Sequence, residues 1–470
     1  MKPEEAVFRR KWARNLCKNE TFLLGEMTFS HDFVLDGLGD PYPVVSRGET
    51  CVETVSHHLY TVQGAVTRAI GELFPYATYE WQGTLRRGRA GFAFQWGEHT
   101  AAVTASREGY AFVFDGETAF LGHPAEDDRQ VLVTLRPGAF DLYERINGAP
   151  VFIHTFPCPA FEEATRYDLF SRGEARLTVD GEAVFSKVAF CMDCGIAQAD
   201  IRPICYEDGT PMTEDGRLYC TASVRTEEHA YQGVFSLVPG TAEVHLVGAL
   251  FFDAGDGMWK NDVASCILYD RRESRWLLWV CSFSHDHILG YAAFDGDPRF
   301  GCNVVDLTLM EKDADAPLTA FVGQPGDEDP SLLYDPADGK WHLAICRIDR
   351  SAGTYRYVFF ASDDPFTGFV YTGQGADGNE TGGSFVNWDG ERCFICGNGD
   401  IGHRSDYRIY TPRGMFAGRF DRPDGGFRGW GTVVAVKQAS RTRRYWLTFD
   451  RQRASSFNWS YGTLYCFEMI

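Results

Sequence analysis

Basic residues are scarce in this chain of 470 residues, in which 45 Lys and Arg stand against 65 Asp and Glu, for a formal net charge of −20. Nucleic-acid phosphates are bound by clustered Lys and Arg, so this deficit argues against a nucleic-acid partner. It also disfavours a polyanionic substrate, while leaving room for a local basic pocket.

Long hydrophobic runs are missing as well. No stretch approaches the roughly 18 apolar residues of a membrane-spanning helix, and residues 1–5 lack the apolar core of a signal peptide. We therefore expect a cytoplasmic protein with no membrane partner.

The 14 cysteines of such a chain are expected to be mostly core thiols. Two Cys-x-x-Cys pairs, Cys191/Cys194 and Cys393/Cys396, have the spacing of half a zinc site. Cys393 and Cys396 lie in a strand-like run, where positions three apart face opposite sides of a sheet. The sequence therefore predicts no metal site at this pair.

Core material is abundant: hydrophobic residues make up 44% of the chain and aromatic residues 14%. The apolar runs are short and broken by turns, and glycine is frequent, with 49 residues. This pattern is typical of an all-β protein, and the length predicts two or three domains.

The N-terminal part is a succession of strand-length segments. From about residue 50 to 190 they recur every ten or so residues, separated by turns such as Asp115-Gly116 and Asn147-Gly148, which favours a lectin-like β-sandwich. Phe8, Trp12 and Leu16 stand among basic residues at helical spacing. We therefore predict a β-sandwich domain over residues 1–194, with a short amphipathic helix at its start.

A hairpin pattern recurs in the second part of the chain. Residues 326–343 show it best: acidic residues and Asp-Pro, a short apolar strand, a tight Asp-Gly turn and an aromatic return strand. Acids begin four such units, 51 to 67 residues apart: Asp200, Asp262, Asp329 and Glu380. With a fifth unit at the end, residues 195–470 are predicted to form a five-bladed β-propeller whose innermost strands bring the acids to a central cavity.

Gathered carboxyl groups suit one kind of chemistry. In a concave pocket they shift their pKa values apart, so that one is ionised and one protonated, which is what hydrolysis of a glycosidic bond requires. The alternative is that each acid merely caps a turn or strand. For a single Asp-Pro this alternative is favoured, but for an ordered series at blade spacing the site is favoured.

The order of these motifs resembles that of the five-bladed propeller glycoside hydrolases of family 43 and their clan relatives, over about residues 195–470. The resemblance implies that Asp200 is the general base, Asp329 the residue that tunes pKa and Glu380 the general acid. Trp259 and Asp262 fall where that family has Trp-Ala-Pro in its second blade, which implies contact with substrate.

The chain departs from the family pattern near each acid. Asp200 is followed by Ile201 rather than Pro, and Glu380 by Thr-Gly rather than Gly-Pro. Asp193 competes with Asp200 for the base role, and Glu328 competes with Asp329.

Three further residues are candidates for substrate binding. Arg202 is expected to pair with Asp200 or to hold a substrate hydroxyl or carboxylate. His285 and His287 would share one face of a strand, where they could contact a sugar or a metal, or form an ordinary surface pair.

The sequence thus predicts a glycoside hydrolase of carbohydrate metabolism that cleaves a plant- or microbe-derived oligosaccharide with inversion, directed to furanosides or xylosides. The alternatives are a non-catalytic glycan-binding protein and a sugar phosphorylase or lyase on the same scaffold. No cofactor is expected, a structural calcium or other ion in the propeller channel is left open, and the oligomeric state is not predicted.

Overall fold

The computed structural model describes residues 2–3, 6–26, 60–124, 128–376, 379–398, 406–421, 431–438, 441–449 and 463–470. Among these residues the helices are a short 3-10 segment, η2 (Pro159–Thr165), and one turn of α-helix, α1 (Tyr167–Phe170). No helix of the described part is long and apolar enough to cross a membrane. The predicted all-β class is confirmed. The chain divides into two compact units, residues 1–20, 194–256 and 260–470 on the one hand, and residues 21–193 with 257–259 on the other.

The unit of residues 21–193 is built from one ten-stranded hydrogen-bonded sheet. Its strands are β2 (Thr21–Glu26), β3 (Tyr60–Glu72), β4 (Thr78–Trp96), β5 (His99–Ser106), β6 (Gly109–Phe114), β7 (Glu117–Gly122), β8 (Asp128–Arg136), β9 (Ala139–Ile146), β10 (Ala149–Pro157) and β11 (Glu174–Asp193).

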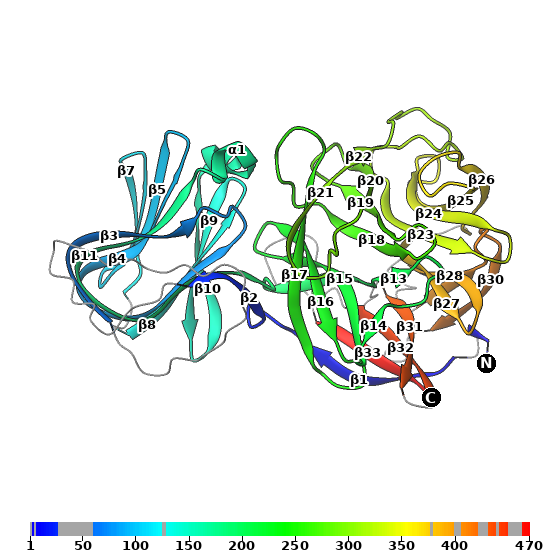
Figure 1. Ribbon diagram of the computed structural model, residues 1–470, viewed down its shortest axis with the longest axis horizontal. Helices are drawn as coiled ribbons and strands as arrows, with labels where there is room; N and C mark the ends of the chain where they lie inside the picture. Colours follow the sequence, from blue (N-terminus) through cyan, green and yellow to red (C-terminus); the bar gives the residue numbers. More distant parts are fainter. Residues whose placement is uncertain are drawn as a thin grey trace. The chain divides into compact units, whose positions relative to one another are not determined.

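Long strands fold this sheet over itself. The first half of β4 pairs with β8 and its second half with β5, while β11 pairs along nearly all of β4. As a result, Phe112 of β6 packs on Phe140 of β9 and Phe156 of β10, with ring centroids 5.4 and 5.2 Å apart. Two layers thus face each other across one aromatic core, which is the predicted β-sandwich (Figure 1).

The other unit contains five sheets, the blades of a propeller (Figure 1). Blade 1 is β12 (Ala197–Pro203), β14 (Thr213–Glu214), β15 (Arg217–Arg225), β16 (Ala230–Leu237), β17 (Val244–Asp253) and β21 (Gly301–Asp306). Blade 2 is β13 (Cys205–Tyr206), β18 (Val263–Asp270), β19 (Arg275–Ser282), β20 (Ile288–Phe294) and β22 (Thr308–Leu309). Blade 3 is β23 (Glu328–Asp335), β24 (Lys340–Asp349), β25 (Thr354–Ser362) and β26 (Val370–Gln374). Blade 4 is β27 (Glu380–Trp388), β28 (Glu391–Asn398), β29 (Asp406–Tyr410) and β30 (Phe416–Asp421). Blade 5 is β31 (Thr432–Gln438), β32 (Arg441–Phe449), β33 (Leu464–Met469) and β1 (Phe8–Arg14).

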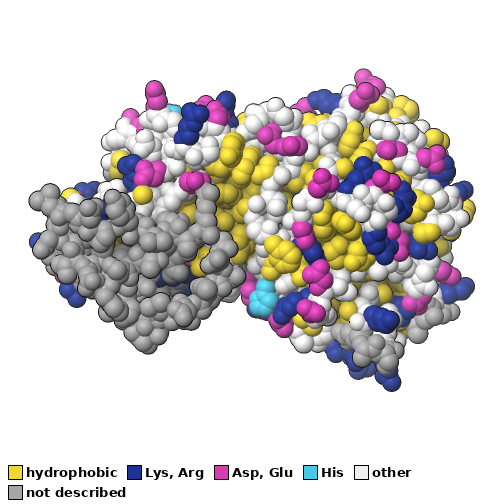
Figure 2. Space-filling model, in the orientation of Figure 1, with side chains coloured by type: hydrophobic (Ala, Val, Ile, Leu, Met, Phe, Trp, Pro, Cys, Tyr) yellow, Lys and Arg dark blue, Asp and Glu magenta, His cyan; other side chains and the backbone are white. Residues whose placement is uncertain are grey.

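The innermost strands close into a ring. Strand β12 contacts β18, and contacts continue from β18 to β23, β27 and β31, and from β31 back to β12. The predicted five-bladed propeller is confirmed. In Figure 2, acidic and basic side chains are interspersed on the face of this unit that is in view.

The predicted N-terminal helix is wrong, because residues 8–14 form strand β1. This strand pairs antiparallel with β33, and its Phe8 packs on Phe420 and Trp446 at 5.8 Å between ring centroids. Apolar residues four apart fit one face of a helix, but they also fit one face of a strand, and pairing with β33 selects the strand. Residues 1–20 therefore belong to the same compact unit as the propeller, and the other unit covers residues 21–193 with 257–259.

Candidate active site

The first four innermost strands carry a β-bulge at the same place. The register shifts between Ala199 and Arg202 in β12, and at the corresponding points of β18, β23 and β27. The first bulged residue of each strand has a positive φ, of 54°, 60°, 48° and 63° for Asp200, Ala264, Asp329 and Gly382. Bulges re-aim side chains and are over-represented next to active sites. Asp200 and Asp329 therefore occupy equivalent positions of blades 1 and 3.

The other two predicted acids occupy a different position. Asp262 and Glu380 each lie two residues before the bulge, where blade 1 has Gln198 and blade 3 has Asp327. All four of these side chains are buried. The four predicted acids thus form two pairs. Asp200 and Asp329 lie on the bulges, whereas Asp262 and Glu380 lie two residues before them.

Asp200 lines a small pocket at the centre of the propeller, together with Ile201, Arg202, Gly382, Ser384 and Gly431. Its carboxylate accepts a hydrogen bond from Ser223 Oγ at 2.7 Å and lies 3.5 Å from Arg225 Nη2. Burial raises the pKa of Asp200 and the charge of Asp329 raises it further, while Arg225 and Ser223 lower it. The result is a carboxyl group at a pocket wall whose pKa is raised by burial and by the charge of a second carboxyl group.

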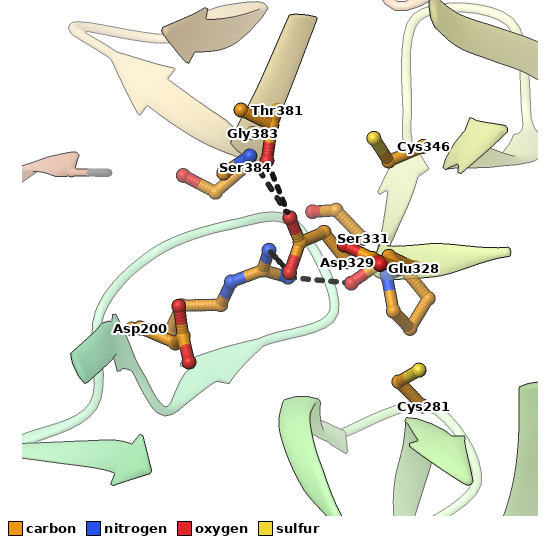
Figure 3. Close-up of polar contacts among 12 residues, drawn as sticks. Asp200, Cys281, Glu328, Asp329, Ser331, Cys346, Thr381, Gly383 and Ser384 are labelled. Carbon is orange, nitrogen blue, oxygen red and sulfur yellow. Dashed lines mark hydrogen bonds and ion pairs between the residues drawn. The ribbon is translucent and has the colours of Figure 1, made fainter. Parts of the chain in front are cut away.

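Asp329 is held by blades 1 and 4. Its Oδ2 accepts hydrogen bonds from Gly382 N at 2.9 Å and Thr381 Oγ1 at 3.2 Å (Figure 3). Arg202 Nη2 lies 3.6 Å from its Oδ1, and Arg202 Nη1 donates to Pro330 O at 2.6 Å. Arg202 Nη2 is buried and has no hydrogen-bond partner among the described residues. Arg202 therefore pairs with Asp329, whereas the sequence led us to expect a pair with Asp200.

Glu380 is not brought to this pocket. Its Oε1 accepts hydrogen bonds from Arg408 Nη1 at 3.0 Å and from the Tyr410 hydroxyl, and its Oε2 accepts one from Tyr357 N at 3.1 Å. The residue is 0% exposed, and a methyl group at Gly375 would lie 1.7 Å from Oε2. Burial raises the pKa of Glu380, while the hydrogen bonds from Tyr410, Tyr357 N and Arg408 lower it. The expected arrangement, with Glu380 facing Asp200 and tuned by Asp329, is not found.

Glu328 adjoins Asp329 and remains partly open. Its Oε1 lies 3.2 Å from His287 Nε2, and the Tyr355 hydroxyl donates to the same oxygen at 3.3 Å. Burial raises the pKa of Glu328 and the charge of Asp329 adds to this, while His287 and Tyr355 lower it.

Asp262 supports the loop that carries both predicted histidines. Its carboxylate accepts hydrogen bonds from Ser284 N at 3.0 Å and from the hydroxyls of Ser282 and Ser284. Burial raises the pKa of Asp262. The segment is a turn and not a strand, because β19 ends at Ser282 and β20 begins at Ile288, so the expected shared face of His285 and His287 is wrong.

The two histidines have different neighbours. His285 Nδ1 lies 2.9 Å from Ser282 Oγ, and its Nε2 lies 3.9 Å from Asp256. His287 instead approaches Glu328. Of the two, only His287 therefore lies against an acid that adjoins Asp329.

Trp259 belongs to the other unit of the chain. It stacks on Tyr167 with 5.6 Å between ring centroids and packs edge-on against Phe170 at 4.6 Å. The competing acid Asp193 is also in that unit, where it accepts a hydrogen bond from Thr78 Oγ1 at 2.5 Å. Neither residue lines the described pocket, and the expected role of Trp259 beside Asp262 is not supported.

Sequence reasoning missed Ser223, Arg225, Tyr355 and Phe283. Each lies on a second or third strand of a blade or on a turn, away from the acidic motifs. They could have been identified only from the register in which the strands of each blade pair.

Metal-ligating side chains gather in one group of three or more within the described residues: Asp335, Asp338 and His342. This group lies on the hairpin of β23 and β24, where Arg413 Nη2 and Lys340 N already bind Asp338. It is separate from the pocket.

No protein-family model and no curated protein matches the sequence. Several solved structures resemble the chain, among them members of family 43, the family that the motifs resemble. A family 43 β-1,3-galactosidase with galactodeoxynojirimycin is 10% identical, with a TM-score of 0.39, over 55% of this chain and 88% of that one. An exo-β-1,3-galactanase from Phanerochaete chrysosporium with β-1,3-galactotriose is 10% identical, with a TM-score of 0.40, over 57% and 60%. Levansucrase from Bacillus subtilis is 12% identical, with a TM-score of 0.39, over 58% and 86%. The assignment of the propeller rests on the strand order of the chain itself.

Proposed function

We propose that the protein is a glycoside hydrolase whose active site is the pocket at the centre of the propeller. The observation that carries this proposal is the pair of bulged aspartates: Asp200 lines that pocket together with Arg202, and Asp329 lies 3.6 Å from Arg202. Positive φ costs free energy in residues other than glycine, and such strain clusters at functional sites. Two aspartates held in this way, with one pKa raised, suit acid–base chemistry on a bound sugar.

Asp200 is the general base in this proposal. Its carboxylate has one short hydrogen bond, from Ser223 at 2.7 Å, and it lines the pocket. In the proposed reaction it accepts the proton of the water molecule that attacks the anomeric carbon. Asp329 has more donors around it and is nearly buried. It acts through charge, because it raises the pKa of Asp200 and holds Arg202.

The substrate proposed is a neutral oligosaccharide, with furanosides and xylosides first, and the stereochemical outcome proposed is inversion. Both come from the resemblance of the motifs to family 43. Inverting enzymes hold their working carboxyl groups about 6.5–9.5 Å apart, which leaves space for the attacking water.

A hydrolysis screen tests the proposal. Nitrophenyl arabinofuranosides, xylosides and galactosides and a set of fructosides are incubated with the full chain and with Asp200→Asn. We expect turnover of at least one sugar by the parent protein and a loss of at least 10²-fold in Asp200→Asn, in line with the usual contribution of acid–base groups. Asp363→Asn, an exposed acid of blade 3, is the matched control and should keep full activity.

Two outcomes would contradict the proposal. Binding of a sugar without turnover would identify a glycan-binding protein instead. Equal activity of the parent and of Asp200→Asn would place the chemistry elsewhere. The anomeric configuration of the first product, followed by proton NMR, tests inversion separately.

A further inference from the structure

The pocket needs a proton donor that can reach a leaving group, and Glu380 does not meet this need. Its carboxylate is enclosed, with both oxygens engaged by Arg408, Tyr410 and Tyr357 N. Contact with a sugar would require the carboxyl group to leave this enclosure and give up at least one of these hydrogen bonds.

Glu328 meets the need better. It is the residue immediately before the bulge that presents Asp329, and its side chain is 14% exposed, whereas Glu380 is 0% exposed. His287 and Tyr355 both approach one oxygen, Oε1. The other oxygen, Oε2, accepts no hydrogen bond from the described residues. Oε1 thus fixes the orientation of the Glu328 carboxyl group, while Oε2 is left to carry a proton.

An aromatic surface lies beside this carboxyl group. Phe283 is 47% exposed, and its ring lies over the ring of His287 with 4.3 Å between centroids. The turn that holds both residues includes Asp286 and His287 in positive φ and is tied down by Asp262. Exposed rings next to a few polar groups are typical of ligand-binding sites.

We propose that Glu328 is the proton donor of the reaction, with His287 and Tyr355 as its positioning residues and Phe283 as a platform for the leaving-group sugar. This inference rests on the proposed function and adds to it the identity of the acid and the place of the departing sugar.

The proposed step combines proton transfer from Glu328 with cleavage of the glycosidic bond. The proton on Glu328 Oε2 moves to the glycosidic oxygen while the bond between that oxygen and the anomeric carbon breaks, and the bonding electrons stay with the oxygen. Water forms the new bond to the anomeric carbon and gives its proton to Asp200. Exchange with solvent then returns a proton to Glu328 and removes one from Asp200.

The electrostatics around Glu328 agree with a proton donor. Burial and the charge of Asp329 raise its pKa, which favours the protonated form, and His287 and Tyr355 moderate the rise. The thiols of Cys281 and Cys346 flank it (Figure 3) and carry raised pKa values of their own. They remain neutral neighbours and do not add a competing charge.

The test compares glycosides of one sugar with leaving groups of graded acidity: 2,4-dinitrophenol, 4-nitrophenol, phenol and methanol. A good leaving group needs little protonation, whereas methanol needs it fully. We expect Glu328→Gln to lower kcat/KM by about 10²–10⁴-fold on the methyl glycoside and by less than about tenfold on the dinitrophenyl glycoside. Glu311→Gln, an exposed acid in the segment before β23, is the matched control and should behave as the parent does.

A second measurement covers the case in which Glu328→Gln does not fold, which circular dichroism would show. His287 lowers the pKa of Glu328, so His287→Gln should move the basic limb of the kcat/KM profile to higher pH. An unmoved limb would overturn the assignment.

The outcomes separate the two proposals. If the parent turns over glycosides and Asp200→Asn does not, but Glu328→Gln keeps the leaving-group dependence of the parent, Glu328 is not the acid and the hydrolase stands. If the parent hydrolyses none of the glycosides, the hydrolase itself falls, and Glu328 with it.

Discussion

Replacement of Glu380 by glutamine separates a structural role of this residue from a catalytic one. The parent carboxylate receives three donors: Arg408 Nη1 and the Tyr410 hydroxyl at Oε1, and Tyr357 N at Oε2. An amide has only one oxygen, so its NH₂ group must face a donor on one side or the other. Glu380→Gln therefore leaves at least one buried donor unsatisfied and Arg408 without its counter-charge.

The cost follows from these contacts. Breaking a buried ion pair costs about 3–5 kcal/mol, and the 13% exposure of the Arg408 side chain reduces the penalty. We expect a loss of about 2–4 kcal/mol in the free energy of unfolding, equivalent to a fall of roughly 5–15 °C in the Tm of the propeller. Differential scanning calorimetry measures this, with the exposed Glu391→Gln of the adjoining strand as control. The folded fraction of Glu380→Gln should keep the leaving-group dependence of the parent.

One result would refute this reasoning. If Glu380→Gln melts with the parent and loses turnover of the methyl glycoside alone, its carboxyl group must reach the substrate. The general acid would then be Glu380, as the resemblance to family 43 implies, and the enclosed conformation would have to open during the reaction.

Three further variants test other parts of the structure. Arg225→Gln should move the acidic limb of the kcat/KM profile to higher pH, because Arg225 lowers the pKa of the base Asp200, which must be deprotonated to act. Arg347→Met should cost about 3–5 kcal/mol in urea unfolding, since it leaves the fully buried carboxylate of Asp327 without the two hydrogen bonds of 2.8 and 2.9 Å that it now accepts. Phe8→Ala should cost about 3–5 kcal/mol, because this buried ring joins β1 to the core of blade 5.

Matched controls exist for the two stability predictions. Arg350→Met and Phe416→Ala replace exposed residues of the same types on blades 3 and 4 and should change the free energy of unfolding by no more than about 0.5 kcal/mol. If the acidic limb of the kcat/KM profile lies at the same pH in Arg225→Gln and in the parent, the assignment of Asp200 as the base is contradicted. Equal losses in a test variant and its control would contradict the corresponding packing argument.

The propeller could be predicted from the sequence because its evidence is local. Each blade contains a hairpin, and turns such as Asp338-Gly339 and Asp389-Gly390 mark hairpins within a few residues. Repetition of that local pattern at blade spacing then gives the architecture.

The site could be predicted only in part, because it depends on register. Asp262 and Asp329 both precede apolar strands, yet one lies two residues before a bulge and the other lies on it. That difference of two residues decides whether a carboxylate lies on the bulge or on the strand before it, and bulges have no fixed sequence pattern outside glycine.

Packing between residues far apart in the sequence accounts for the other differences between prediction and structure. Trp259 is three residues from Asp262 in sequence, but its ring is held by Tyr167 and Phe170, about 90 residues earlier. In the same way, the strand formed by residues 8–14 is selected by a partner at the far end of the chain.

The pairing of β1 with β33 sets an order of events during synthesis. Residues 8–14 are made more than four hundred residues before their partner, Leu464–Met469. The sandwich, whose first strand β2 pairs with its last strand β11, can fold while β1, the outer strand of blade 5, still has no partner. Until β33 arrives, Phe8 and Trp12 have no ladder to join, and such distant pairing slows folding. The emergence of β33, rather than of any earlier blade, should therefore be the point at which the propeller becomes resistant to proteolysis.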